Sequence, residues 1–225
     1  MRYQQRRRKR ICYMCDADGV TREHAPPSRF FPEGKKSRLI TVRSCELHNH
    51  GNSKDVEYVR NLISGSVNAN EIGRAIHQDR SLQSYRDSPR LLNQTFSVIE
   101  PIFVDGQLSV KVSTESIRFK QVIDAIAYAL YFYEFKETFK FTWKLFNDIV
   151  VPMADEHDEF VEVERNRHRI LCESMVPHLK VGLADQPDVF RYGVYKGEEP
   201  YMVFFQFVFY GGVVIYASGE PVLSV

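Results

Sequence analysis

Two short cysteine motifs constrain the fold of this chain more than any other feature of its sequence. Two residues separate Cys12 from Cys15 and two separate Cys45 from His48, with about thirty residues between the pairs. Two such turns can each donate two ligands to one tetrahedral zinc ion. Four protein ligands leave that ion no open position for water or substrate, so we expect a structural zinc site. Cys172, on an expected helix, is interpreted as core packing.

Composition indicates a folded chain outside the membrane. The sequence has 225 residues, of which 44% are hydrophobic and 13% aromatic, enough to build a packed core. It has no run of eighteen apolar residues, and its start lacks the apolar segment of a secretory signal. We therefore expect a cytoplasmic protein, in which close cysteine pairs favour metal binding over disulfides.

Positive charge is concentrated at the front of the chain. Residues 1–60 contain 14 Lys and Arg against 7 Asp and Glu, whereas the remainder has a net charge of −6. The densest run is Arg6, Arg7, Arg8, Lys9 and Arg10. Such a run suits contacts with the phosphates of nucleic acid, and its alternative interpretation is a solvated tail.

The segment between the two cysteine motifs reads Thr21-Arg-Glu-His-Ala-Pro-Pro27. Here the chain resembles the HNH endonuclease family, in particular its zinc-braced members with a ββα-metal fold. The match consists of Glu23, His24 and Pro27 upstream, and of the second cysteine motif followed by Asn49 and by small and basic residues. His48 stands where that family more often has cysteine. The resemblance covers residues 10–65, about a quarter of the chain, and implies a helix that begins at Asn49.

The resemblance implies a role for each matching residue. His24 is the expected general base, because imidazole titrates near neutral pH and can activate water. Glu23 and Asn49 are the expected oxygen ligands of a catalytic Mg²⁺ or Mn²⁺. The sequence His-Asn-His at residues 48–50 is then a coincidence, because His48 is an expected zinc ligand and Asn49 an expected magnesium ligand. We interpret the third residue, His50, as a phosphate contact.

Supporting roles are open to a few further residues. The middle Asn of the family motif has no counterpart in this sequence, so we expect backbone groups or Thr41 to brace the loop. Asn52 or Asp55 could add a further contact to the metal from the start of the helix.

The remaining three quarters of the chain predict a second, α+β domain with an antiparallel sheet. We expect an HNH domain over residues 1–65, a linker over 66–94 with a short helix near 71–77, and the α+β domain over 95–225. Asp105-Gly106 between two apolar runs predicts a hairpin. The expected elements after it are a helix from about 113 onward, a strand at 141–151, an acidic helix at 155–178 and aromatic strands at 189–195, 201–210 and 213–217.

These observations leave two classes of function open. The first is a metal-dependent endonuclease that hydrolyses DNA, in which each catalytic site nicks one strand. Family analogy associates such a protein with anti-phage defence or mobile elements. The second is a non-catalytic zinc module that binds nucleic acid or protein. The Glu23-His24 pair favours the first. DNA versus RNA, the oligomeric state and a protein partner for residues 95–225 are left open by the sequence.

Overall fold

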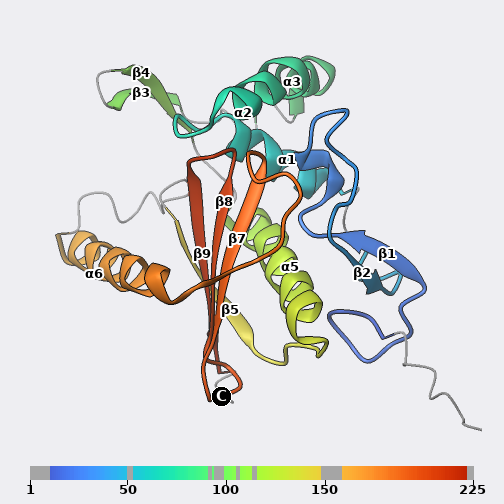
Figure 1. Ribbon diagram of the computed structural model, residues 1–225. Coiled ribbons are helices and arrows are strands. Elements are labelled where there is room, and N and C mark those ends of the chain that lie inside the picture. Colours follow the sequence, from blue (N-terminus) through green and yellow to red (C-terminus); the bar gives the residue numbers. More distant parts are fainter. Residues whose placement is uncertain are drawn as a thin grey trace, which may run out of the picture.

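A five-stranded antiparallel sheet and the long helix α5 (Ser116–Phe135) form the centre of the molecule (Figure 1). The structure, a computed structural model, describes residues 11–49, 53–90, 93, 99–104, 107–112, 116–147 and 159–221. The sheet has the strand order β5-β9-β8-β7-β6. Its strands are β5 (Thr142–Asn147), β6 (Lys180–Val181), β7 (Phe190–Lys196), β8 (Val203–Phe209) and β9 (Val213–Glu220).

Aromatic and β-branched residues explain why the C-terminal segments form strands. In β8, alternate residues Phe205, Phe207 and Phe209 are completely buried, as expected where successive side chains of a strand point to opposite faces. Gly211 lies between β8 and β9 at φ 77°, a left-handed conformation that glycine adopts without steric cost. The prediction of an antiparallel, aromatic-rich sheet is confirmed.

Helix α5 carries apolar residues at helical spacing and lies between the sheet and the N-terminal elements (Figure 1). Phe119, Ile123, Ile126 and Leu130 on it are at most 2% exposed. They recur at intervals of three or four residues, which places them on one side of the helix. The predicted helix is confirmed, although its expected cap at residues 113–114 lies outside the described residues.

The N-terminal part has the order strand, strand, helix. Strand β1 (Thr21–His24) pairs antiparallel with β2 (Thr41–Ser44), a 3-10 turn (Ser28–Phe30) lies between them, and α1 (Lys54–Ser64) follows. The Ser53 side chain caps α1 by accepting the backbone N–H of Val56 at 3.2 Å. The helix therefore begins at Lys54, and the start at Asn49 implied by the resemblance is wrong.

The segment predicted as a linker contains more helix than expected. Helices α2 (Glu71–Ile76) and α3 (Leu82–Asp87) are joined by a π-helical turn (His77–Ser81). Buried residues from both sides of the segment belong to one apolar cluster. The hydroxyl of Tyr210, on the sheet side, donates a hydrogen bond of 2.8 Å to the carbonyl oxygen of Phe30. The division into two domains stays a prediction, and the two parts share a core.

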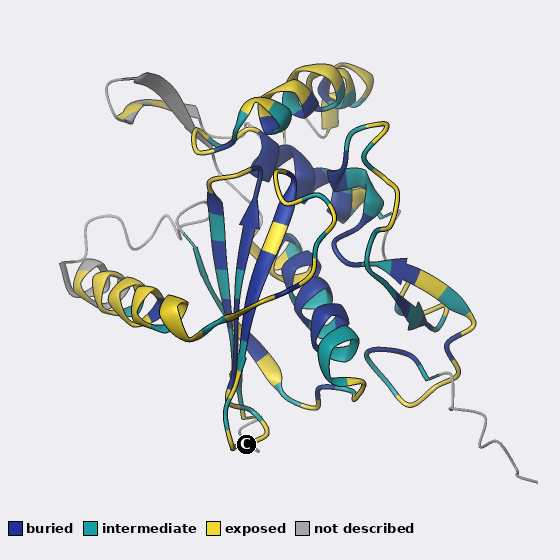
Figure 2. Ribbon diagram, in the orientation of Figure 1, coloured by how far each residue is buried: buried dark blue, intermediate teal, exposed yellow. Residues whose placement is uncertain are grey.

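Two peripheral elements complete the described fold. Strands β3 (Ile99–Val104) and β4 (Gln107–Val112) form the predicted hairpin, whose turn residues 105–106 lie outside the described part. Helix α6 (Glu159–Met175) lies at the edge of the molecule, largely exposed where its burial is described (Figure 2), and ends in a 3-10 turn (Val176–His178). Cys172 on α6 is 3% exposed, which confirms its packing role. No helix in the described part is long and apolar enough to cross a membrane.

Candidate metal centre and adjoining pocket

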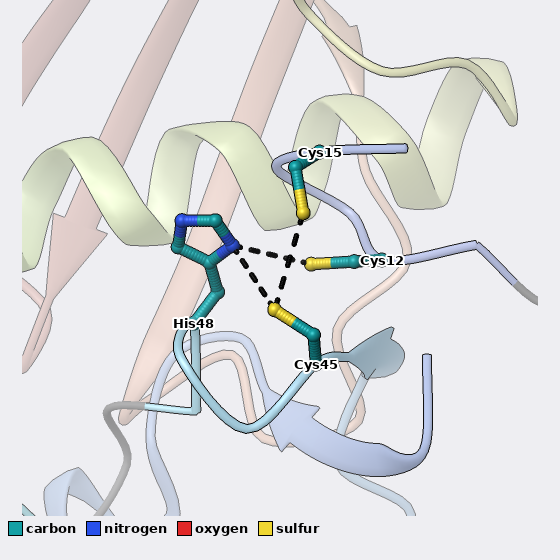
Figure 3. Close-up of side chains that lie close together, drawn as sticks. All are labelled: Cys12, Cys15, Cys45 and His48. Atoms are coloured by element: carbon teal, nitrogen blue, oxygen red, sulfur yellow. Dashed lines mark hydrogen bonds between the residues drawn. The ribbon is translucent and has the colours of Figure 1, made fainter. Parts of the chain in front are cut away.

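The two cysteine motifs come together, and their four side chains converge on one point (Figure 3). The Sγ atoms of Cys12, Cys15 and Cys45 and a ring nitrogen of His48 all lie within 4.8 Å of one another. His48 Nδ1 is 3.5 Å from Cys12 Sγ and 3.3 Å from Cys45 Sγ, and the Sγ atoms of Cys15 and Cys45 are 3.9 Å apart.

These separations fit a tetrahedral zinc ion. With Zn–S near ~2.3 Å and Zn–N near ~2.0 Å, ligand atoms of a tetrahedral site are separated by about 3.5 to 3.8 Å. Burial raises the pKa of the Cys12 thiol, but backbone N–H groups of Cys45, Met14 and Cys15 outweigh it and bring the pKa to about 7. A thiol near that pKa is readily available as the thiolate ligand that zinc requires. The residues therefore form a Cys₃His site that could hold a zinc ion.

Backbone hydrogen bonds fold the first cysteine motif onto the β1–β2 hairpin. The N–H of Cys12 donates to the carbonyl of Ala17 at 2.9 Å, which closes the turn that carries Cys15. The N–H of Tyr13 donates to the carbonyl of Arg43 in β2, also at 2.9 Å. The second motif starts just after β2, so the hairpin brings both motifs to the same place.

A pocket of about 320 Å³ adjoins the candidate zinc site, close to the lower end of the volumes of small-molecule sites. Four elements contribute to its wall: the first cysteine motif, the end of β1, the start of α1 and the middle of α5. The lining residues are Tyr13, Met14, Glu23, His24, Pro27, Ser53, Asp55, Val56, Gln121, Val122, Asp124, Ala125, Ile126 and Tyr128. The sequence-predicted pair Glu23 and His24 is therefore in a pocket.

The orientation of His24 follows from its hydrogen-bond partner on β2. Thr41 is the register partner of His24, and its Oγ1 lies 3.2 Å from His24 Nδ1. The single hydroxyl proton of Thr41 is donated to the carbonyl of Leu39 at 3.1 Å. If the hydroxyl proton goes to Leu39, the Thr41 oxygen accepts from His24 Nδ1, and Nε2 is then the ring nitrogen left for another partner.

Glu23 is only 5% exposed and lines the pocket beside His24. Tyr13, which is completely buried, has a pKa raised first by its burial and second by the nearby carboxylate of Glu23. The Tyr13 hydroxyl donates to the backbone carbonyl of His48 at 3.1 Å. Tyr13 thus links the wall of the pocket to the loop that carries Cys45 and His48 of the candidate zinc site.

The residues that α5 adds to the pocket were missed from the sequence. Asp124 lies within the apolar stretch from Val122 to Ile126, and a carboxylate among buried apolar residues was a signal that could have identified it. Asp55, which the sequence suggests as a supporting residue, lines the pocket and pairs with Arg118 of α5 at 2.6 Å. This ion pair fixes the start of α1 against α5.

The other sequence-predicted residues have a different placement. Asn49 is exposed and is not among the described residues that line the pocket. His50 and Asn52, and the basic residues Arg6, Arg7, Arg8, Lys9 and Arg10, lie outside the described residues. Within the described part, the Cys₃His cluster is the only group of three or more His, Cys, Asp or Glu side chains spaced to hold a metal ion.

Comparisons of the chain with models of known protein families, with curated proteins and with solved structures found no match.

Proposed function

We propose that this protein is a metal-dependent endonuclease of the HNH type that hydrolyses phosphodiester bonds of DNA. The proposal is carried by the placement of Glu23 and His24 together in the pocket, with His24 Nδ1 3.2 Å from Thr41 Oγ1 so that Nε2 is the ring nitrogen proposed to act on water. A general base must present such a lone pair to the proton that it removes. The strand, strand, helix order beside a Cys₃His cluster supports the same proposal.

In this proposal each residue of the pocket has one task. His24 Nε2 accepts the proton of the water that attacks the phosphorus atom. The Glu23 carboxylate holds a divalent cation, which when bound neutralises charge on the leaving oxygen. Asn49 remains the proposed second oxygen ligand, although it is exposed and lies outside the wall of the pocket. The Asp55–Arg118 pair keeps the start of α1 in place behind these groups.

The zinc-site residues have a structural task. Four protein ligands would occupy every position of a tetrahedral ion, so the water that attacks the substrate is not activated there. Tyr13 and Met14, between two zinc ligands in sequence, form part of the pocket wall. The zinc therefore supports the shape of the pocket next to it.

The deciding experiment is cleavage of supercoiled plasmid by purified, zinc-loaded protein in the presence of Mg²⁺ or Mn²⁺. We expect nicked circles from the wild type and a loss of roughly 10²- to 10⁴-fold in rate for His24→Ala, the range that general-base catalysis contributes. His178→Ala, in the 3-10 turn after α6, is the matched control and should keep full activity. Both variants should retain zinc.

Wild-type rates for His24→Ala would overturn the assignment of the base. If the wild type cleaves no DNA or RNA with either metal, the non-catalytic zinc module takes the place of the nuclease. Glu23→Ala should also lose activity, and because it removes a ligand rather than the base, higher metal concentration should restore part of it.

A further inference from the structure

The β1–β2 ladder has one buried face and one accessible face, and the proposed base lies on the accessible one. Glu23 of β1 and Val42 of β2 are register partners, and both are at most 5% exposed. His24 and Thr41 form the next pair and are half-buried. Because successive side chains of a strand point to opposite faces, a substrate that reaches His24 over this ladder approaches from the accessible face.

Arg22 and Arg43 stand on that accessible face, directly opposite each other and two positions along the strands from the pair that contains His24. Arg22 is exposed and Arg43 is half-buried. The carbonyl of Arg43 accepts the backbone N–H of Tyr13, so it points away from β1. The two arginines are therefore a non-hydrogen-bonded pair of the antiparallel ladder, the kind whose side chains lie closer, with Cα atoms about 4.5 Å apart.

This arrangement places two like charges side by side. Like charges directly opposite in a ladder destabilise it. Neither guanidinium group has a hydrogen bond or an ion pair with any residue that the structure describes. By contrast, Arg29, Arg80 and Arg118 each form an ion pair with a carboxylate. The fold thus leaves the charges of Arg22 and Arg43 available to an anion.

The pocket beside this pair lacks the positive charge that a phosphate requires. Glu23, Asp55 and Asp124 are among its lining residues, and no Lys or Arg is among those described. A nucleic-acid strand that places a phosphodiester at His24 is repelled by these carboxylates unless cations offset them. The arginine pair supplies two such charges next to the pocket rather than inside it.

We propose that Arg22 and Arg43 together bind the backbone phosphate that adjoins the one cleaved at His24. Two residues along a strand span about 6.6 to 6.8 Å, which is of the order of the separation between successive phosphates of one nucleic-acid strand. Guanidinium groups carry planar sets of N–H donors that match phosphate oxygens. Contacts to phosphate fix the register of the strand without reading its sequence. The proposal rests on the proposed function and adds a positioning site for its substrate.

Binding of a short DNA duplex to the zinc-loaded full chain, without Mg²⁺ or Mn²⁺, tests the pair separately from cleavage. We expect Arg22→Gln and Arg43→Gln each to weaken binding by about tenfold, the lower end of what a hydrogen bond to a charged group contributes. Arg191→Gln is the matched control, because Arg191 is also an exposed strand arginine but lies on β7 of the five-stranded sheet. It should bind like the wild type.

The double variant shows whether the two arginines share one phosphate. Its loss of affinity should be smaller than the product of the two single losses, because each arginine acts on the same group. A plot of the logarithm of the binding constant against the logarithm of the salt concentration should become less steep by about 0.9, the value for one phosphate. Single losses that multiply, or unchanged binding in the double variant, would overturn the proposal.

A purely structural role for the pair would appear in the stability of the fold. We expect Arg22→Gln to melt at or above the wild-type temperature, because it removes a like-charge repulsion, and to keep its zinc. Arg22→Lys keeps the charge without the planar donors and should recover part of the lost affinity. Weaker binding that comes with a lower melting temperature or with loss of zinc would overturn the role in binding.

The kinetics of plasmid nicking give the second readout. We expect the double variant to need more DNA for half of its maximal rate but to keep most of its rate at saturating DNA, whereas His24→Ala loses the saturated rate. If the double variant binds DNA weakly and the wild type cuts nothing, the nuclease proposal fails and the arginine pair stands as a phosphate site. If the double variant binds and nicks like the wild type, the nuclease stands and the arginine pair fails.

Discussion

Thr41 Oγ1 lies 3.2 Å from His24 Nδ1, directly across the β1–β2 ladder, and 3.1 Å from the carbonyl oxygen of Leu39. This arrangement places a hydroxyl on β2 where it can orient the ring of the proposed base and bias its tautomer. The middle Asn of the HNH motif is missing from the sequence, and Thr41 was one of the two replacements expected.

We therefore predict that Thr41→Val lowers the plasmid-nicking rate by about 10- to 100-fold, the usual cost of losing a group that orients a functional side chain. Valine has a similar shape but cannot accept the Nδ1 proton. Thr41→Ser keeps the hydroxyl and should retain most of the activity. Equal rates for the valine and serine variants, both with full zinc content, would show that the tautomer of His24 does not depend on Thr41.

A second prediction concerns the Cys₃His cluster. Metal analysis should find about one equivalent of zinc in the wild type and a clear loss in Cys45→Ser, because three ligands remain where four are needed. Cys172→Ser is the control, since this buried cysteine lies on α6 outside the cluster. Undiminished zinc in Cys45→Ser would mean that the ion is bound elsewhere.

The third prediction is a pH dependence that comes from Asp124. Burial raises the pKa of its carboxyl above the ordinary 3.8, and Lys120 only partly opposes this. The folded protein thus binds this proton more tightly than the unfolded chain, so the stability contributed by Asp124 is greatest in acid and falls as pH rises from about 4 through the folded-state pKa.

Asp124→Asn should remove that loss. Its melting temperature relative to the wild type should increase between pH 4 and pH 7.5 and then level off, as measured by thermal unfolding at a series of pH values. The Cys₃His site is the same in both proteins, so its effect on the melting temperature cancels in the difference. A difference that is constant with pH, or that decreases as pH rises, would contradict the assignment.

A fourth prediction tests the contact between the N-terminal part and the sheet. Tyr210 is fully buried, and its hydroxyl donates to the carbonyl of Phe30. Tyr210→Phe should lower the free energy of unfolding by about 1 to 3 kcal/mol, because it leaves a buried carbonyl unpaired. Tyr195→Phe, on the half-buried part of β7, should cost less in the same urea titration. Similar losses of unfolding free energy in the two variants would show that the hydrogen bond from Tyr210 to Phe30 adds no stability.

The fifth prediction concerns the basic residues at the start of the sequence. Deletion of residues 2–10 removes six Lys and Arg and should weaken DNA binding, because fewer phosphates are neutralised. A plot of the logarithm of the binding constant against the logarithm of the salt concentration should become less steep. Its slope should change by up to about 0.9 for each phosphate that these residues neutralise in the wild type. Zinc content should not change. Unaltered affinity and salt slope would show that the run does not touch DNA.

The Cys₃His cluster and the sheet were predictable because each depends on a short sequence pattern. The spacing of Cys12, Cys15, Cys45 and His48 is sufficient to suggest one tetrahedral site, and the short aromatic and β-branched run of β8 is sufficient to predict a strand. The start of α1 was misplaced because Asn49 resembled a family position, whereas Ser53 supplies the actual cap.

The α5 side of the pocket could not be predicted because it depends on long-range packing. Asp124 is about one hundred residues from His24 in sequence, and no local pattern states which residues face each other across a tertiary contact. The same reason applies to Tyr128 and to the Asp55–Arg118 pair. A carboxylate within a buried apolar helix indicated an unusual position, but not the pocket that it faces.

The joint construction of the pocket by the β1–β2–α1 unit and α5 limits how this chain can be divided or exchanged. A fragment that ends near residue 65 would keep His24, Glu23 and the zinc ligands and would lose one side of the pocket. Grafting that fragment onto another C-terminal region would transfer Glu23 and His24 without the α5 residues that complete the pocket. The two parts therefore have to change together in evolution or in a designed chimera, because the pocket is lined by residues of both.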